Sequence, residues 1–196
     1  EILVSLSTTP IPGHAGTAFS RISNSPSVSQ SGQDAAFTAN GGAVSGAYKR
    51  TNGGALERIA DTDSLIPGTD GQVFLSFSEE LSLENGQVVF IASGPSFMKG
   101  VYTDVGGSLS VIVDDQNNSI IELDNQMEQV QDFDLSTKSF AYTPQGYMVV
   151  FYAFLKSRES VIIRATINVG GTANEPNIAV SGDGTFGDVN TGSSKT

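Results

Sequence analysis

Acidic residues cluster where the sequence turns, and they are the first candidates for chemistry. Asp61 and Asp63 follow one short apolar run, and Asp114 and Asp115 follow another. Carboxylates and backbone carbonyls are the oxygen ligands that Ca²⁺ prefers. However, the sequence contains no Asp-x-Asp-x-Asp-Gly loop, and aspartate is a common turn residue without any metal. Both interpretations of these four carboxylates therefore stay open, and no cofactor other than Ca²⁺ is indicated.

Three aromatic residues late in the chain are the candidates for ligand binding. Tyr142, Tyr147 and Phe154 could offer flat apolar faces to a sugar ring. Sugar-binding proteins often use tryptophan for this purpose, and this sequence has none. The pattern nevertheless makes polysaccharide the expected ligand class.

Catalytic residue types are few, and no catalytic residue can be assigned. His14 is the only histidine and lies in a Pro/Gly-rich loop without an obvious partner, which argues against a nucleophilic triad. The sequence contains neither a phosphate-binding P-loop nor a cluster of zinc ligands. A glycoside hydrolase needs only two carboxylates, so a glycan-active hydrolase with an unidentified acidic pair remains the alternative function.

Composition excludes several classes of protein. The 196 residues suit one domain, or one domain with a tail, and the net charge of −11 opposes nucleic acid binding. No run is long enough to cross a membrane as a helix. The chain has no cysteine, so it has neither disulfides nor thiolate chemistry. A cysteine-free, acidic chain rich in small polar residues favours the exterior of a bacterium, at the cell surface or beyond it.

The elements that must position these residues repeat along the chain. Phe37, Phe90 and Phe151 each lie in a run of the form small or apolar residue, Phe, any residue, Ala. Many further matches keep the same order at a spacing of about 53 to 55 residues, a period typical of repeat architectures. The matched segments are Gly46-Ala47-Tyr48 with Gly100-Val101-Tyr102, Ile59-Ala60-Asp61 with Ile112-Val113-Asp114, and Ile11-Pro12-Gly13 with Ile66-Pro67-Gly68.

One repeat unit is predicted to contain four short strands. They cover residues 71–77, 87–92, 100–103 and 109–113, which are rich in Val, Ile, Phe and Tyr and bounded by turn residues. Phe74 and Phe77 of the first strand are matched downstream by Met127 and Val130. Ile163 takes the place of the tyrosine in the third unit, and a position that accepts isoleucine favours a core role for Tyr48 and Tyr102.

The unit resembles a tandem repeat of secreted or surface-anchored bacterial proteins, notably cyanobacterial ones. The resemblance rests on residues 87–92, on Gly100-Val101-Tyr102, and on the closing segment from Ile59 to Gly68, and it covers roughly residues 2–166. It implies propeller-like blades. We therefore expect an all-β fold of three four-stranded antiparallel units around a pseudo-threefold axis, with a β-prism and a β-trefoil as alternatives.

Two segments compete to complete the third unit. The stretch from Ile2 to Ser7 is apolar and could close the ring, whereas Asn177 to Ser181 could be the unit's own fourth strand. We favour the N-terminal strand, because the alternative follows Pro176 in a polar stretch. This choice divides the chain into a β domain of residues 1–168 and a polar extension of residues 169–196. It predicts a monomer, or a homopolymer if the N-terminal strand is donated to a neighbouring copy.

Together these features favour a secreted, non-enzymatic binding or structural protein of the cell surface or extracellular matrix. The hydrolase and the strand-exchanging filament subunit are the alternatives.

Overall fold

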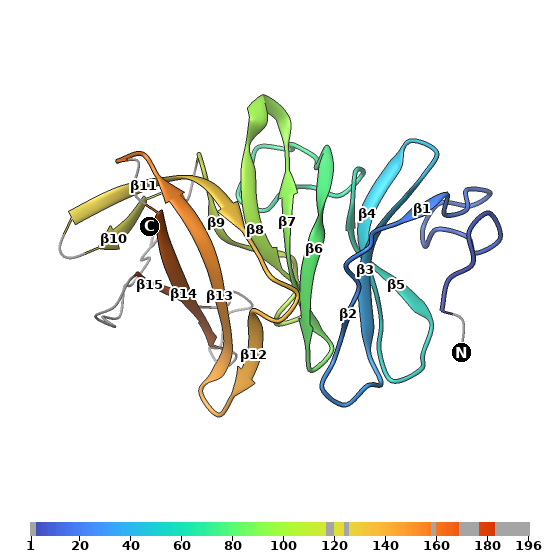
Figure 1. The fold of residues 1–196 in the computed structure, drawn as a ribbon. Helices are drawn as coiled ribbons and strands as arrows, with labels where there is room; N and C mark the ends of the chain where they lie inside the picture. Colours follow the sequence, from blue (N-terminus) through green and yellow to red (C-terminus); the bar gives the residue numbers. More distant parts are fainter. Residues whose placement is uncertain (1–2, 117–119, 124–125, 158–159, 169–176, 183–196) are drawn as a thin grey trace.

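The described part of the protein forms three antiparallel β-sheets (Figure 1). The computed structural model describes residues 3–116, 120–123, 126–157, 160–168 and 177–182. In those ranges the only helical element is the 3₁₀ turn η1, Pro95–Phe97, so none of the described residues forms a helix that is long and apolar enough to span a membrane. The predicted all-β class is confirmed.

Each sheet has four strand positions. The strand order is β1-β3-β4-β5 in the first sheet, β6-β7-β8-β9 in the second and β10-β11-β13-β14-β15 in the third. The first position is shared by β1 and β2 on one edge of β3, and by β11 and β12 on one edge of β13, while β10 is an addition beyond β11. The strands of the first sheet are β1 Arg21–Ile22, β2 Ser27–Val28, β3 Ala35–Gly41, β4 Val44–Arg50 and β5 Leu56–Asp61. Those of the second are β6 Ser76–Glu84, β7 Gln87–Ser93, β8 Lys99–Thr103 and β9 Ser110–Asp114. Those of the third are β10 Ile120–Leu123, β11 Gln126–Asp134, β12 Phe140–Thr143, β13 Gly146–Leu155, β14 Ser160–Asn168 and β15 Asn177–Gly182.

The phenylalanines of the repeated runs lie in the core, as predicted. Phe37, Phe90 and Phe151 are 4%, 0% and 2% exposed. Each faces the predicted residue on the next strand: Tyr48, Tyr102 and Ile163, all completely buried.

The two buried tyrosines pack in the same way. The ring of Tyr48 meets Phe19 edge-on at 5.0 Å and 84°, and the ring of Tyr102 meets Phe74 at 4.9 Å and 88°. Such edge-to-face pairs stabilise a core beyond the area they bury. The aromatic residues of the sequence pattern therefore form equivalent core contacts in the first two sheets.

The sheets pack in succession through the two faces of β7. Val88, Phe90 and Ala92 belong to a core cluster that includes Ala36 and Ala47 of the first sheet. Their neighbours Val89 and Ile91 point to the other side, into a cluster with the third sheet. The remaining face of the first sheet packs on Ile11 and Phe19 of the N-terminal segment.

Buried hydrogen bonds join the first strands of the three sheets. The hydroxyls of Ser27 and Ser82 both donate to the carbonyl of Thr137, at 3.2 and 3.1 Å. Ser27 also accepts a hydrogen bond from the backbone N–H of Leu83 at 3.1 Å. Ser27 and Ser82 lie at corresponding points of β2 and β6, and Thr137 lies in the β11–β12 connection, so the early parts of all three sheets meet there.

The strand that completes the third sheet differs from the one we favoured. β15 pairs with β14 along its whole length, so part of the predicted extension of residues 169–196 belongs to the sheet. Residues 3–9 instead form turns beside the first sheet, where the Ser7 N–H donates to the carbonyl of Phe19. Residues 1–2 of the predicted closing strand lie outside the described part. Of the apolar side chains in that segment, Val4 is partly buried against the first sheet, whereas Leu3 and Leu6 are exposed.

The predicted first strand of the unit is also displaced. Residues 71–75 form the approach to β6, which begins at Ser76 and contains an irregularity between Phe77 and Leu81. In the third sheet Phe133 faces Ala153 as Phe77 faces Ala92, so Phe133, and not Val130, corresponds to Phe77. The bulge interrupts the alternation that sequence matching relies on.

Candidate functional site

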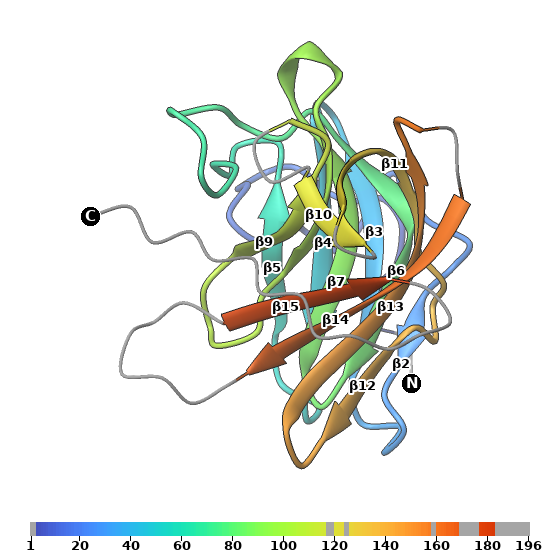
Figure 2. The same cartoon turned by 90° about the vertical axis from the view of Figure 1, so that its left-hand side faces the viewer.

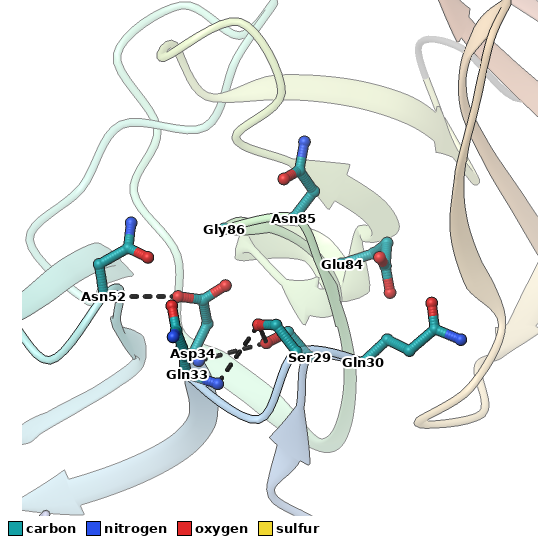
Figure 3. Close-up of a pocket in the computed structure, with 9 residues that line it drawn as sticks. Ser29, Gln30, Gln33, Asp34, Asn52, Glu84, Asn85 and Gly86 are labelled. Carbon is teal, nitrogen blue, oxygen red and sulfur yellow. Dashed lines mark hydrogen bonds between the residues drawn. The ribbon is translucent and has the colours of Figure 1, made fainter.

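A polar pocket with a volume of about 560 Å³ lies where turns of the first two sheets meet (Figure 3). One wall is formed by the β2–β3 connection, from which Ser29, Gln30 and Asp34 line the pocket. The β4–β5 turn contributes Asn52, and the β6–β7 turn contributes residues 84–86. These turns lie at one end of the molecule together with the β12–β13 turn, as two perpendicular views show (Figures 1 and 2).

Asparagine-glycine pairs shape two of these turns. Asn85 and Gly86 have φ angles of 48° and 72°, and Asn52 and Gly53 have 50° and 67°. Asparagine tolerates this left-handed region better than other residues with a side chain, and glycine adopts it freely, which makes Asn-Gly the strongest short hairpin signal. Because asparagine takes the first left-handed position in both turns, two amide-bearing residues border the pocket.

Asp34 is the buried acid of the pocket. It is 7% exposed, and its Oδ1 accepts a hydrogen bond from the Asn52 N–H at 2.8 Å. Its own N–H donates to Ser29 Oγ at 3.2 Å, and its carbonyl accepts from the Ser29 N–H at 3.1 Å. These bonds fix the Asp34 carboxylate between two turns.

A buried ion pair behind the pocket holds its two walls together. Lys49 on β4 donates to Asp104 Oδ2 at 2.6 Å and to the carbonyl of Gly86 at 2.8 Å. Asp104 Oδ1 in turn accepts from the Val88 N–H at 2.6 Å. Burial raises the pKa of Asp104, and the attraction of Lys49 offsets that effect only in part. Through these bonds the Lys49–Asp104 ion pair links the first sheet to the β6–β7 turn.

Two of the three predicted aromatic residues come together beside this pocket. Tyr142 and Tyr147 face each other on β12 and β13, with ring centroids 5.0 Å apart. The Tyr147 hydroxyl accepts a hydrogen bond from the side chain of Asn85 at 3.2 Å, whereas Tyr142 is 56% exposed. Burial raises the pKa of Tyr147. Phe154 lies near the other end of β13 on its opposite face, so it does not join the pair.

The predicted calcium carboxylate Asp61 is surrounded by donors. Its Oδ2 accepts from His14 Nε2 at 2.6 Å and from Arg58 at 3.0 Å, and its Oδ1 accepts from the Asp63 N–H and the Ser64 hydroxyl, each at 3.0 Å. Two nitrogen donors on one carboxylate oxygen do not make the all-oxygen environment that Ca²⁺ requires. Asp63 lies at the surface, 3.8 Å from His14 Nδ1.

The second predicted pair of carboxylates, Asp114 and Asp115, also accepts hydrogen bonds from backbone N–H groups at turns. Asp114 Oδ1 accepts from the Gln116 N–H at 2.8 Å, and Asp115 Oδ1 accepts from the Lys99 N–H at 2.9 Å. Burial raises the pKa of Asp115. Across the residues that the structure describes, no group of three or more His, Asp or Glu side chains is arranged to hold a metal ion.

His14 does have a partner, Asp61, which lies 47 residues away in the chain and carries no local sequence signal. Asp61 lies between His14 and Ser64 and accepts from both, whereas a catalytic triad places the histidine between the acid and the nucleophile. This cluster therefore fastens the loop of residues 11–14 to the end of β5.

The sequence analysis did not identify the residues of the pocket, although the Asn-Gly pairs mark two of the turns that form it.

No protein-family model, curated protein or solved structure matches the chain.

Proposed function

We propose that the protein is a non-enzymatic polysaccharide-binding protein of the bacterial cell surface or extracellular matrix. The observation that supports this most directly is the polar pocket beside the Tyr142–Tyr147 pair, joined by the hydrogen bond from Asn85 to Tyr147. The acidic composition and the absence of cysteine support the extracellular setting.

The chemistry of the pocket suits a hydroxyl-rich ligand. Carboxylates and amide oxygens accept hydrogen bonds, and amide N–H groups donate them, so Asp34, Asn52 and Asn85 can complement hydroxyls of either polarity. The exposed ring of Tyr142 offers a flat apolar surface next to these groups. Polar groups that fix orientation next to an aromatic surface are the usual composition of a binding site for small molecules.

The scaffold we propose is propeller-like, with the three sheets as successive blades. The buried contact among Ser27, Ser82 and Thr137 would lie at the axis, where the first strands of the blades come together. In this proposal the three blades form an open series and not a closed ring, because Ile11 and Phe19 of the N-terminal segment cover the face of the first sheet that points away from the second sheet.

Binding can be tested by calorimetry with a panel of hexasaccharides and two single variants. Gln33 of the β2–β3 connection also lines the pocket. We expect Tyr142→Ala and Gln33→Ala each to weaken binding of any bound hexasaccharide about tenfold, a change of about 1.4 kcal/mol. Tyr152→Ala is the matched control, because Tyr152 is also an exposed tyrosine of the third sheet but lies toward the other end of β13. Equal losses in all three variants, or no binding across the panel, would contradict the proposal.

A hydrolase remains the second candidate, because Asp34 and Glu84 line the same pocket. Glycoside hydrolysis needs an acid and a second carboxylate on either side of the sugar. Turnover of chromogenic glycosides that disappears in both Asp34→Asn and Glu84→Gln would establish this activity. Turnover that persists in either variant would exclude a hydrolase that uses this pair of carboxylates.

A further inference from the structure

The charged groups that line the pocket are all acidic among the described residues. Asp34 and Glu84 contribute carboxylates, and no lysine or arginine of the described chain lines the cavity. Two cations of β4 have partners of their own, and one of them, Lys49, donates to the carbonyl of Gly86 at the pocket. Lys49 pairs with Asp104, and Arg50 donates to the carbonyls of Gly53 and Gly54 in the β4–β5 turn.

One oxygen of the buried acid is turned toward the cavity. Asp34 Oδ1 is held by the Asn52 N–H, but Oδ2 has no hydrogen-bond partner among the described residues. Figure 3 shows this second oxygen directed into the space below Asn85 and Gly86. A carboxylate that is 7% exposed has little access to solvent, so a ligand donor at this place would meet a strong acceptor.

Resting on the proposed function, we infer that the preferred ligand is a polysaccharide of amino sugars with free ammonium groups. An ammonium group offers three N–H donors and a positive charge, which match Asp34 and Glu84. N-acetylation removes the charge, and a uronic acid would bring a third carboxylate to a pocket whose described lining residues include no lysine or arginine. The same charges that attract a glucosamine polymer therefore disfavour acidic polysaccharides.

The inference is tested by calorimetry at one fixed ionic strength with the hexamers of glucosamine, N-acetylglucosamine and galacturonate. We expect the glucosamine hexamer to bind at least tenfold more tightly than the N-acetylated one, and the galacturonate hexamer to bind most weakly. Asp34→Asn and Glu84→Gln should each remove most of this preference, because each should weaken binding of the glucosamine hexamer far more than binding of the N-acetylated hexamer. Asp70→Asn removes the same charge from an exposed turn outside the pocket and should leave the preference intact.

Each other outcome overturns the inference in a recognisable way. Equal or tighter binding of the N-acetylated hexamer would refute the amino-sugar preference but leave polysaccharide binding standing. Binding of none of the three hexamers would refute the inference, and a further null across the wider hexasaccharide panel would refute the proposed function with it. Equal binding of a lysine hexamer would show attraction by charge alone, and binding lost on chelation of Ca²⁺ would show a metal-dependent site. A urea-unfolding midpoint shared by the variants and the parent chain shows that changes in affinity do not come from misfolding.

Discussion

At the scale of single residues, the Gly-x-Tyr pattern is a packing requirement. A Cβ on Gly100 would lie 2.7 Å from the Tyr102 hydroxyl oxygen, because the tyrosine ring folds back over the glycine. The third sheet has Val161 and Ile163 at the two corresponding places, which face Ala153 and Phe151. Glycine is thus needed only where the large ring is present.

We expect Gly100→Val to lower the free energy of unfolding by about 1 to 3 kcal/mol, the usual effect of overpacking. In a Tyr102→Ile background the same change should be much less harmful, because the three atoms nearest to the added Cβ all belong to the Tyr102 side chain. A double-mutant cycle measured by urea unfolding gives the coupling directly. Additive effects of the two changes would contradict the explanation.

Gly46 supplies the matched control for this cycle. A Cβ there would lie 2.8 Å from the Tyr48 hydroxyl oxygen but also 2.7 Å from the backbone carbonyl oxygen of Ala60. Replacing Tyr48 by isoleucine should therefore rescue Gly46→Val only in part.

At the scale of elements, the turn that ends β5 depends on one carboxylate. Burial of Asp61 acts to raise its pKa, but hydrogen bonds from His14, Arg58, Asp63 and Ser64 outweigh that effect and hold the pKa below its ordinary value. A carboxyl group with a lowered pKa in the folded state stabilises the fold above its unfolded pKa. That contribution is lost as the pH falls through the folded pKa.

Asp61→Asn should consequently lower the free energy of unfolding by about 1 to 3 kcal/mol at neutral pH. The difference from the parent chain should shrink as the pH falls below about 3.9, the ordinary pKa of aspartate. Urea unfolding between neutral pH and pH values below that pKa measures both quantities. Asp63→Asn is the control, because Asp63 is exposed and should change stability little at any pH; a difference for Asp61→Asn that does not vary with pH would disprove the assignment.

At the scale of the whole molecule, the edge of the third sheet is completed by β15. This strand pairs with β14 from Asn168 opposite Asn177 to Ile163 opposite Gly182. Without it, β14 would present a row of unpaired backbone groups, which is a template for association.

A chain truncated after residue 176 should therefore unfold at lower urea concentration and associate in sedimentation experiments. Truncation after residue 182 removes residues 183–196 but keeps β15, so it should match the parent chain. Addition of a synthetic peptide of residues 177–182 should restore the stability of the shorter chain and suppress its association. If a peptide of residues 1–9 restored it equally well, the proposed strand exchange between copies would gain support, and failure of that peptide would count against it.

The sequence by itself determined the class of fold and the composition of the core. The spacing of Phe37, Phe90 and Phe151, and the tyrosines or isoleucine opposite them, depends on local alternation of side chains, which a period of two residues reveals. The strands predicted at residues 87–92, 100–103 and 109–113 were correct within two residues for the same reason.

Only the tertiary structure decided which segments meet. The closing strand was predicted wrongly because two segments at opposite ends of the chain compete for one edge, and local polarity does not settle a long-range pairing. His14 with Asp61, and Asp34 with Glu84, are likewise far apart in the sequence. The Asn-Gly pairs predict turns. The pocket, however, depends on the contact between Lys49 and Asp104, which holds parts of two sheets together, and no local sequence pattern reveals that contact.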